Sequence, residues 1–244
     1  DDFVAWSIEN KYYGAENLSK IPGTVGAAPI QNIGAYGVEL EEIFSSLEAI
    51  AIATGDLQLF DYDQLNFGYR DSIFKQELKN KYIIINVIFK LSKKPHYKID
   101  YGNIQAELEK NSQQQLSPAL IRKVISDIRS SKLPEPKDIG NAGSYFKNPL
   151  ISHAKYQELK DIYTSLVAYD MGEKGMKLAA GWLIDQAGLK GKIKGNVGIH
   201  KKQALIIINL GGATGPEILK FSEEVQDIVN KKFGVILERE VNVI

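Results

Sequence analysis

Two long amphipathic segments stand out in the pattern of apolar and polar positions. Residues 116–132 carry apolar side chains at helical spacing, at Leu120, Ile121, Val124, Ile125 and Ile128. Ser117 followed by a proline is typical of a helix start, because the serine side chain caps free N–H groups and proline fits the first turn. Residues 214–234 show a second such pattern, in which Thr214 and Glu217 form a capping box and a glycine closes the helix. Both segments are predicted to be helices with one buried face.

Shorter apolar runs between turn residues predict the strands. Residues 43–52 and 57–62 flank the sequence ATGD and indicate a β-hairpin, and residues 81–92 form a further strand with an apolar centre. The remaining elements are helices at 3–12, 153–166 and 178–188, and strands at 144–148, 203–209 and 235–244. Because strands and helices are interspersed without a regular alternation, the predicted class is α+β or irregular α/β.

Composition excludes several classes of function. The 244-residue chain holds 30 basic and 30 acidic residues, and a net charge of zero disfavours nucleic acid as the main partner. No apolar run approaches the ~18 residues that span a bilayer, and the start shows no signal peptide. The absence of cysteine excludes disulfides and thiolate chemistry, and it fits a cytoplasmic location. The chain opens with DDFVAWSIEN rather than with Met, so we expect that further residues precede it in the natural protein.

The stretch GNAGSYFKNP (140–149) is the first candidate for chemistry. Its glycines let the backbone approach a ligand closely, and they lead to Ser144. A serine nucleophile needs a base within hydrogen-bond reach, usually histidine, and the sequence does not place His96, His153 or His200 near it. The chain also has no G-x-S-x-G elbow, so a hydrolase triad is disfavoured. A tight glycine turn and a proton-donor role both stay open for Ser144.

Arg70 is the second candidate, within the aromatic stretch FGYRDSIFK (67–75). A guanidinium suits a carboxylate or a phosphate, which it holds with two parallel hydrogen bonds. The alternative interpretation is a local surface ion pair with Asp71.

Two other stretches carry polar or flexible positions. Glu238 and Glu240 lie on one face of the strand predicted at the end of the chain, where two carboxylates together raise the pKa of one of them. A solvated strand face is the alternative. Residues 21–37 are rich in glycine and proline and almost uncharged, which is typical of a buried or ligand-facing loop. They match neither a G-x-G-x-x-G motif after a strand nor a P-loop, and no spacing of His or carboxylates indicates a metal site.

Five stretches in a fixed order resemble one family. They are IPGTVGAAPIQNIGAYGVEL, FGYRDSIFK, GNAGSYFKNP, KLAAGWLIDQAGLKG and LEREV. Together they are similar to the UDP-N-acetylenolpyruvoylglucosamine reductases, flavoenzymes of bacterial peptidoglycan synthesis. The likeness runs from about residue 12 to the end. Helical insertions and the stretch DYGNI indicate the longer type of the family, which closes a loop over its substrate.

The resemblance implies an α+β fold with two domains. These are the later part of a vanillyl-alcohol-oxidase (PCMH-type) FAD-binding region, expected at residues 1–130, and an α+β substrate-binding domain at 131–244, whose last strand returns to the flavin side. The family's Gly- and Ser-rich pyrophosphate loop lies in an N-terminal segment that this chain lacks. Ala27 stands where some relatives carry Ser, and Asn242 where relatives often carry Arg.

The resemblance also implies a reaction that uses FAD and NADPH. NADPH gives a hydride to FAD, reduced flavin passes a hydride to C3 of the enolpyruvyl group of UDP-N-acetylglucosamine enolpyruvate, and C2 takes a proton to give UDP-N-acetylmuramate. Ser144 matches the proton donor to C2, and Arg70 matches the residue that holds the substrate carboxylate and stabilises the developing charge. Glu240 matches the acidic partner of that carboxylate, for which a raised pKa is expected.

Further site residues follow from the same resemblance. The substrate-binding positions are Tyr36, Tyr101, Lys132, Asn148, Lys190 and Gln203. The cofactor-binding positions are Ile21, Gly23, Gly26, Ile30, Ile33 and Gly34. The expected partner is a small UDP-sugar, with no nucleic acid and no membrane, and the protein is expected to be a monomer. Two alternatives stay open, a flavin-free chain that only binds a UDP-sugar and another FAD-dependent oxidoreductase of the same superfold.

Overall fold

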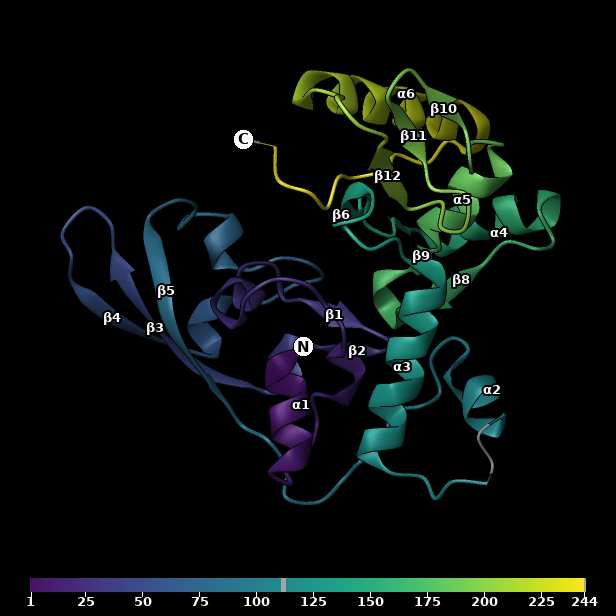
Figure 1. Ribbon diagram of the computed structural model, residues 1–244. Coiled ribbons are helices and arrows are strands. Elements are labelled where there is room, and N and C mark those ends of the chain that lie inside the picture. Colours follow the sequence, from purple (N-terminus) through teal and green to yellow (C-terminus); the bar gives the residue numbers. More distant parts are fainter. Residues whose placement is uncertain (111–112, 244) are drawn as a thin grey trace. The chain divides into compact units, whose positions relative to one another are not determined.

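The computed structural model describes residues 1–110 and 113–243, and the chain divides into two compact units (Figure 1). The first unit is Asp1–Arg129 and the second is Ser130–Ile244. Each unit buries its own apolar core, and helices and strands are interspersed in both. The fold class is therefore α+β. The assignment of the two units to flavin binding and substrate binding stays a prediction.

The first unit contains three α-helices, several short 3₁₀ helices and two small sheets among its described residues. The helices are α1 (Asp2–Glu9), α2 (Ile104–Glu109) and α3 (Pro118–Lys132), the last of which runs three residues past the boundary between the units. The strands are β1 (Gly34–Ala35), β2 (Val38–Glu39), β3 (Phe44–Ala51), β4 (Leu57–Asp61) and β5 (Tyr82–Phe89). Strands β1 and β2 pair with each other, and the other three form an antiparallel sheet in the order β4-β3-β5. The predicted hairpin and the strand after it are thus confirmed.

The sheet β4-β3-β5 has one face covered within the unit and one that is exposed. Leu47, Ala49 and Phe60 belong to the buried core of the first unit. The opposite face exposes large aliphatic side chains on β4 and β5, at Leu57, Leu59, Ile83, Ile85 and Ile88. Helix α3 packs its predicted apolar stripe into a separate cluster with Ile104, and the Ser117 hydroxyl accepts a hydrogen bond from Leu120 N–H at 3.2 Å.

The second unit has two antiparallel sheets, three α-helices and one short 3₁₀ helix among its described residues. The strands are β6 (Gly140–Ser144), β7 (Leu150–Ile151), β8 (Ala168–Asp170), β9 (Met176–Leu178), β10 (Ile193–Lys194), β11 (Val197–Ile199) and β12 (Ile206–Asn209). They form one sheet in the order β10-β11-β12-β6 and another in the order β7-β9-β8. The helices are α4 (His153–Ile162), α5 (Ala180–Gln186) and α6 (Gly215–Phe233). Helix α6 contacts β11, β12 and α5, and residues of all three segments share one core with Phe146 and Leu237.

The ends of α6 follow the sequence, whereas the segment after it does not. Thr214 and Glu217 form the capping box, and Gly234 closes the helix in the left-handed conformation with φ 63°. Residues 235–243 do not form the predicted strand. Within them the structure has only an isolated bridge at Arg239, because the segment pairs with a short stretch beside Phe146. Residue 244 lies outside the described residues.

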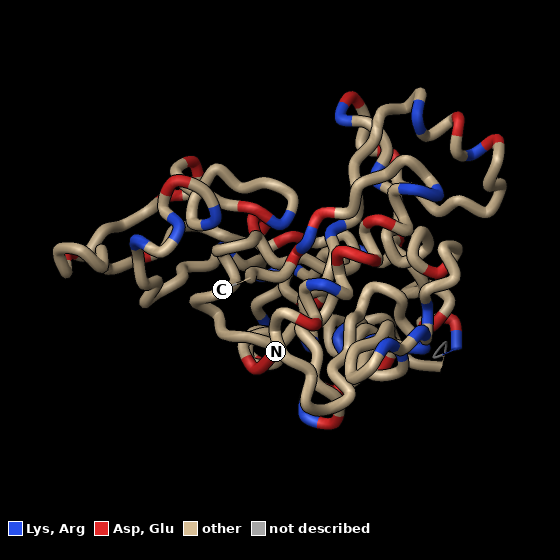
Figure 2. The backbone as a smooth tube through the Cα atoms, turned by 90° about the horizontal axis from the view of Figure 1, so that it is seen from above, with Lys and Arg blue, Asp and Glu red and all other residues tan. Residues whose placement is uncertain are grey.

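Several further boundaries differ from the sequence prediction. The helix predicted at 3–12 ends at Glu9, the helix predicted at 178–188 covers Ala180–Gln186, and the strand predicted at 203–209 begins at Ile206. The helix after Ser152 ends at Ile162 rather than near residue 166, and the strand expected at 144–148 instead ends at Ser144. Tyr145 and Phe146 are buried and point into the core. Basic and acidic residues are interspersed along the backbone, in keeping with the net charge of zero (Figure 2).

Candidate functional site

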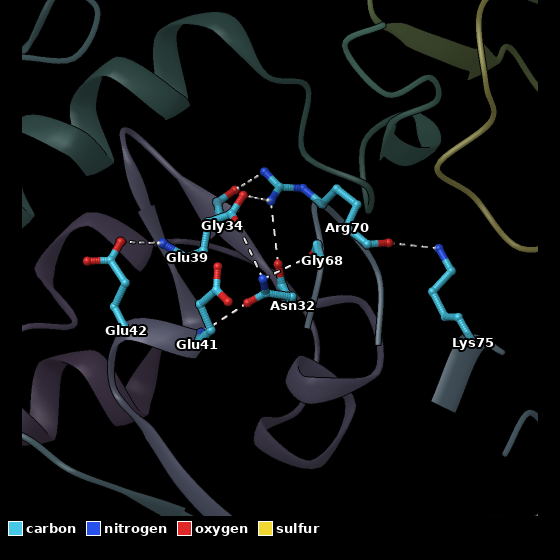
Figure 3. A network of polar contacts seen from close by, with 8 residues as sticks. All are labelled: Asn32, Gly34, Glu39, Glu41, Glu42, Gly68, Arg70 and Lys75. Carbon is cyan, nitrogen blue, oxygen red and sulfur yellow. Dashed lines mark hydrogen bonds and ion pairs between the residues drawn. The ribbon is translucent and has the colours of Figure 1, made fainter. Parts of the chain in front are cut away.

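Arg70 lies at the centre of a polar network in the first unit (Figure 3). Its Nη2 donates to the Gly34 carbonyl oxygen at 2.5 Å, and its Nη1 donates to Glu39 Oε1 at 3.2 Å and to the Asn32 carbonyl oxygen at 3.4 Å. The Arg70 side chain is only 14% exposed. The network therefore fixes both the position and the plane of the guanidinium before any ligand binds.

The carboxylate partner of Arg70 comes from a distant part of the chain rather than from the next residue. Glu39 stands 31 positions earlier. Asp71 accepts instead from Ser72 N–H at 3.0 Å and from Gln76 Nε2 at 2.7 Å. Arg70 itself has a positive φ of 55°, a strained conformation for a long side chain that is typical of functional positions. These contacts replace the local Arg70–Asp71 pair that the sequence left open.

The Asn32 side chain stabilises this network through hydrogen bonds to three of its members. Its Nδ2 donates to Glu39 Oε2 and to the Gly68 carbonyl oxygen, both at 3.1 Å, and its Oδ1 accepts from Glu41 N–H at 3.0 Å. The residue is fully buried and sits in the left-handed region with φ 44°. Asparagine tolerates this region better than most residues, so its type suits both its backbone and its contacts.

Gly34 leaves the space that Arg70 occupies. A Cβ atom at this position would stand 2.7 Å from Arg70 Nη1 and 2.9 Å from the Val38 carbonyl oxygen. The close approach of backbone and guanidinium therefore requires glycine here. Gly26 has a comparable structural reason, since its Cβ would meet the Ile84 carbonyl oxygen at 3.3 Å.

A cavity of ≈ 140 Å³ opens beside the glycine-rich stretch. Among the predicted cofactor positions it is lined by Ile21, Gly23 and Ile33, together with apolar side chains such as Phe3 and Phe89. Gly23 has φ 111° and no heavy atom within 4 Å of where a Cβ would stand, so its backbone is open to a ligand. Ile30 contacts a different segment of the first unit, because its carbonyl oxygen accepts from the Ser72 hydroxyl at 2.7 Å.

Tyr36 and Tyr101 lie close together in the first unit. A Cβ on Gly37 would be 3.3 Å from the Cβ of Tyr101, so the side chain of Tyr101 lies against the turn that carries Tyr36. Asn17 Nδ2 ties the same turn to the segment before Tyr101, by donating to the carbonyl oxygens of Tyr36 and Lys98 at 2.8 Å each. Burial raises the pKa of the Tyr36 hydroxyl, although a hydrogen bond with Arg129 opposes the shift. Tyr36 therefore acts as a neutral hydrogen-bonding group.

In the second unit, Ser144 lies beside the segment that carries Glu240. Glu240 N–H donates to the Tyr145 carbonyl oxygen at 2.9 Å, so the two predicted catalytic residues stand on adjacent backbone segments. Ser144 ends β6 in register with Ile206 and is exposed, after Gly143 with φ 74°. Glu238, which the sequence predicted on the same face as Glu240, forms an ion pair with Lys147 at 2.5 Å.

Contacts connect three of the predicted substrate positions of the second unit, which are Asn148, Gln203 and Lys132. Asn148 Oδ1 accepts from Ala180 N–H at 2.9 Å at the start of α5, and Gln203 Oε1 would be 3.3 Å from a Cβ on the next residue, Gly181. Lys132, exposed at the end of α3, follows Ser131, whose carbonyl oxygen accepts from Lys202 Nζ at 3.4 Å. Lys190 lies beyond the other end of α5 and pairs with Asp185 at 3.0 Å.

Sequence reasoning missed the residues that hold the predicted site in place. They are Asn17, Asn32, Glu39 and Arg239. One signal was present for Glu39, which is the first charged residue after Lys20 and so interrupts a long uncharged stretch. A single carboxylate in such surroundings is a candidate partner for an arginine elsewhere.

Comparison with known proteins shows the family of the chain. Residues 135–244 match the family model described as UDP-N-acetylenolpyruvoylglucosamine reductase, C-terminal domain. The UDP-N-acetylenolpyruvoylglucosamine reductase of Flavobacterium johnsoniae is 48% identical over 244 residues, which is 100% of this chain and 72% of the relative. That of Pseudomonas aeruginosa is 47% identical over 242 residues, or 99% of this chain and 71% of the relative. The chain belongs to the UDP-N-acetylenolpyruvoylglucosamine reductase family.

The fold agrees with that of a solved family member. The crystal structure of UDP-N-acetylenolpyruvylglucosamine reductase (MurB) from Thermus caldophilus superposes with a TM-score of 0.63 at 22% identity, covering 99% of this chain and 68% of the other. The chain thus spans about seven tenths of the length of the reductases that it matches. Within residues 1–110 and 113–243, no helix is long and apolar enough to cross a membrane, and no cluster of three or more His, Cys, Asp or Glu side chains offers a metal site.

Proposed function

We propose that this chain reduces the enolpyruvyl group of UDP-N-acetylenolpyruvoylglucosamine to give UDP-N-acetylmuramate, with FAD and NADPH as cofactors. The observation that carries the proposal is the pairing of the Ser144 segment with the Glu240 segment in the second unit, through the hydrogen bond from Glu240 N–H to the Tyr145 carbonyl oxygen. A family of enolpyruvyl reductases needs a proton donor and a group that meets the substrate carboxylate. Both residue types stand on these two segments.

Ser144 is proposed to donate the proton to C2. A serine hydroxyl is a weak acid in water, but transfer to a carbon with carbanion character is downhill, so no histidine is required. The position suits this role because Ser144 is exposed at the end of β6, where a ligand has access to it. Glu240 is proposed to meet the substrate carboxylate in its protonated form, as a hydrogen-bond donor.

Arg70 is proposed to hold the substrate carboxylate and to stabilise the negative charge that grows on it. Preorganised donors are effective because they do not have to reorient during the reaction. The contacts of Arg70 with Gly34 and Glu39 supply this preorganisation, and its low exposure of 14% limits screening by water.

The glycine-rich loop of the first unit fits a flat apolar part of FAD. Ile21, Gly23 and Ile33 line the cavity of ≈ 140 Å³, and the open backbone at Gly23 permits close approach of a ring. FAD bound there, and reduced by NADPH, would supply the hydride that reaches C3 of the substrate. Gly26, Ile30 and Gly34 are proposed to support this loop through the contacts described above.

The UDP-sugar is proposed as the small-molecule partner of a monomeric protein. Lys132 and Lys190 carry positive charges that suit a diphosphate, while Asn148 and Gln203 offer amide groups. Asn148 uses its side-chain oxygen to accept from Ala180 N–H, so a ligand would meet its amide nitrogen. Tyr101, beside the Tyr36 turn, is proposed to cover the substrate as part of a closing loop.

The proposal is tested by separating the two halves of the reaction in stopped-flow experiments. In Ser144→Ala, reoxidation of the flavin by the enolpyruvyl substrate should slow by about a hundred-fold or more, as is usual when a general acid is lost, while reduction by NADPH stays at the wild-type rate. Ser165→Ala is the matched control, because Ser165 is another exposed serine of the second unit. Equal slowing of both half-reactions would exclude the proton-donor role.

Cofactor binding is measured first, by quenching of flavin fluorescence on titration with the chain, with and without the UDP-sugar. Saturable FAD binding supports the redox function. Binding of the UDP-sugar without any binding of FAD would overturn the redox part of the proposal for this chain and favour the flavin-free alternative.

A further inference from the structure

The segment that carries Glu240 is fixed to the rest of the second unit by side chains as well as by backbone contacts. Its backbone runs antiparallel to the residues after Ser144, with Lys147 N–H donating to the Glu238 carbonyl oxygen at 2.8 Å and an isolated bridge between Phe146 and Arg239. Only a few backbone hydrogen bonds connect the two stretches. Such a short pairing does not by itself set the register strongly.

Arg239 supplies the missing constraint on the opposite side of the segment. Its Nε donates to Ser222 Oγ at 3.0 Å, and its Nη2 donates to Glu223 Oε1 at 3.3 Å. Both partners belong to helix α6. Ser222 is fully buried, and its hydroxyl donates to the Leu219 carbonyl oxygen at 2.6 Å, so its position is fixed by the helix. The guanidinium therefore joins the segment to a rigid element.

Two neighbouring contacts complete the attachment. Gln226 Nε2, also on α6, donates to the Leu237 carbonyl oxygen at 2.6 Å, and Lys147 Nζ forms an ion pair with Glu238 at 2.5 Å. In an extended segment, successive side chains point to opposite sides. Arg239 faces α6, and Glu238 faces the other way, toward the side on which Lys147 contacts it.

A shift of the segment by one residue would reverse these directions and break the hydrogen bond from Glu240 N–H to the Tyr145 carbonyl oxygen. The contact of Arg239 with Ser222 and Glu223 opposes that shift, because the guanidinium would lose both partners. We propose that Arg239 is a positioning residue, which fixes the register of residues 237–240 on helix α6 and thereby holds the backbone of Glu240 against that of Tyr145, next to Ser144. The roles of Glu240 and Ser144 in this inference rest on the proposed function, whereas the register does not.

The register is tested by hydrogen–deuterium exchange of the intact chain, read by mass spectrometry on peptides that contain the amides of Lys147 and Glu240. In Arg239→Met these amides should exchange about ten-fold faster, the effect expected from losing a hydrogen bond to a charged group, while helix α6 keeps its protection. Ser222→Ala removes one partner of Arg239 and should give a smaller change in the same direction. Arg239→Lys retains a charge toward Glu223 and should restore part of the protection.

Lys194→Met is the matched control. Lys194 also pairs with helix α6, through contacts of 2.6 and 2.8 Å to Glu224. These contacts do not involve residues 237–240. It should leave the two amides at their wild-type exchange rates. Unchanged exchange in Arg239→Met, or equal acceleration in Lys194→Met, would overturn the inference.

A second measurement separates this inference from the proposed function. By isothermal titration calorimetry, Arg239→Met should bind the enolpyruvyl UDP-sugar about ten-fold more weakly, as loss of one well-placed hydrogen bond predicts, and bind UDP with unchanged affinity. Faster exchange without this selective loss would overturn the positioning role. If the wild-type chain binds neither compound, the proposed function fails, while the exchange experiment still decides whether Arg239 sets the register.

Discussion

Removing the Asn32 side chain is the most direct test of the network around Arg70. In Asn32→Ala, Glu41 N–H loses its partner, while the Gly68 carbonyl and Glu39 Oε2 each lose one donor. The Gly68 carbonyl still accepts from Asp71 N–H. The substitution also places alanine at φ 44°, where a residue other than glycine or asparagine is strained. Both effects act on a position with no exposure to solvent.

The magnitude follows from these contacts. Each hydrogen bond contributes about 1 kcal/mol, and a buried group left without a partner costs about 1–3 kcal/mol. The left-handed backbone adds about 1–2 kcal/mol for alanine. Because Glu39 and Gly68 keep some access to water, we take the lower values and expect Asn32→Ala to lower the free energy of unfolding of the first unit by about 3–4 kcal/mol. Asn32→Gly loses the same hydrogen bonds but accepts the backbone conformation, so it should lose about 1–2 kcal/mol less.

The two tryptophans of the chain allow each unit to be followed separately. Trp6 lies in α1 of the first unit and Trp182 in α5 of the second, so in a Trp182→Phe background the fluorescence of Trp6 reports urea unfolding of the first unit. A loss below about 1 kcal/mol in Asn32→Ala, within the range of ordinary surface substitutions, would refute the view that this network stabilises the unit. Equal losses in Asn32→Ala and Asn32→Gly would refute the contribution from the backbone.

Two further substitutions test neighbouring features. Gly34→Ala places a methyl group 2.7 Å from Arg70 Nη1. We therefore expect the free energy of unfolding to fall by about 1–3 kcal/mol from overpacking and the guanidinium to be displaced. An unchanged urea midpoint and an unchanged Arg70 conformation in a crystal structure of the variant would contradict this. Burial raises the pKa of Glu16 above its ordinary 4.5, because Oε1 is buried without a hydrogen-bond partner although Oε2 accepts from Gly14 N–H. Ionisation of Glu16 is therefore less favourable in the folded chain than in the unfolded chain. The stability of the wild type relative to Glu16→Gln should be greatest below pH 4.5 and fall as the pH rises through the raised pKa. Parallel profiles of melting temperature against pH for the two proteins would rule out this raised pKa.

Local signals in the sequence predicted the elements whose ends are set by their own residues. Helix α6 begins at the Thr214–Glu217 capping box and ends at Gly234, and helix α3 begins after Ser117, as the sequence indicated. Caps and helical spacing depend on residues three or four apart, so they are visible in a short window.

Contacts between distant residues could not be predicted in this way. Nothing near Arg70 in the sequence indicates that Glu39, rather than Asp71, is its partner. Residues 235–243 have the alternation of a strand, but a strand also needs a partner of matching length, and the stretch beside Phe146 offers only a short one. The residue types of the candidate site were thus available from the sequence and its resemblance, whereas the side chains that hold them, such as Asn32 and Arg239, required the structure.

The pairing beside Ser144 has a consequence for the order in which the chain folds during its synthesis. Lys147 and its partner Glu238 stand 91 positions apart, and a ribosome needs about 5–20 seconds to add that many residues. The first unit, which ends at Arg129, emerges well before this and is able to fold as the chain grows. Until then Tyr145 and Phe146 lack that partner, so the nascent second unit exposes aromatic surface of the kind that chaperones bind.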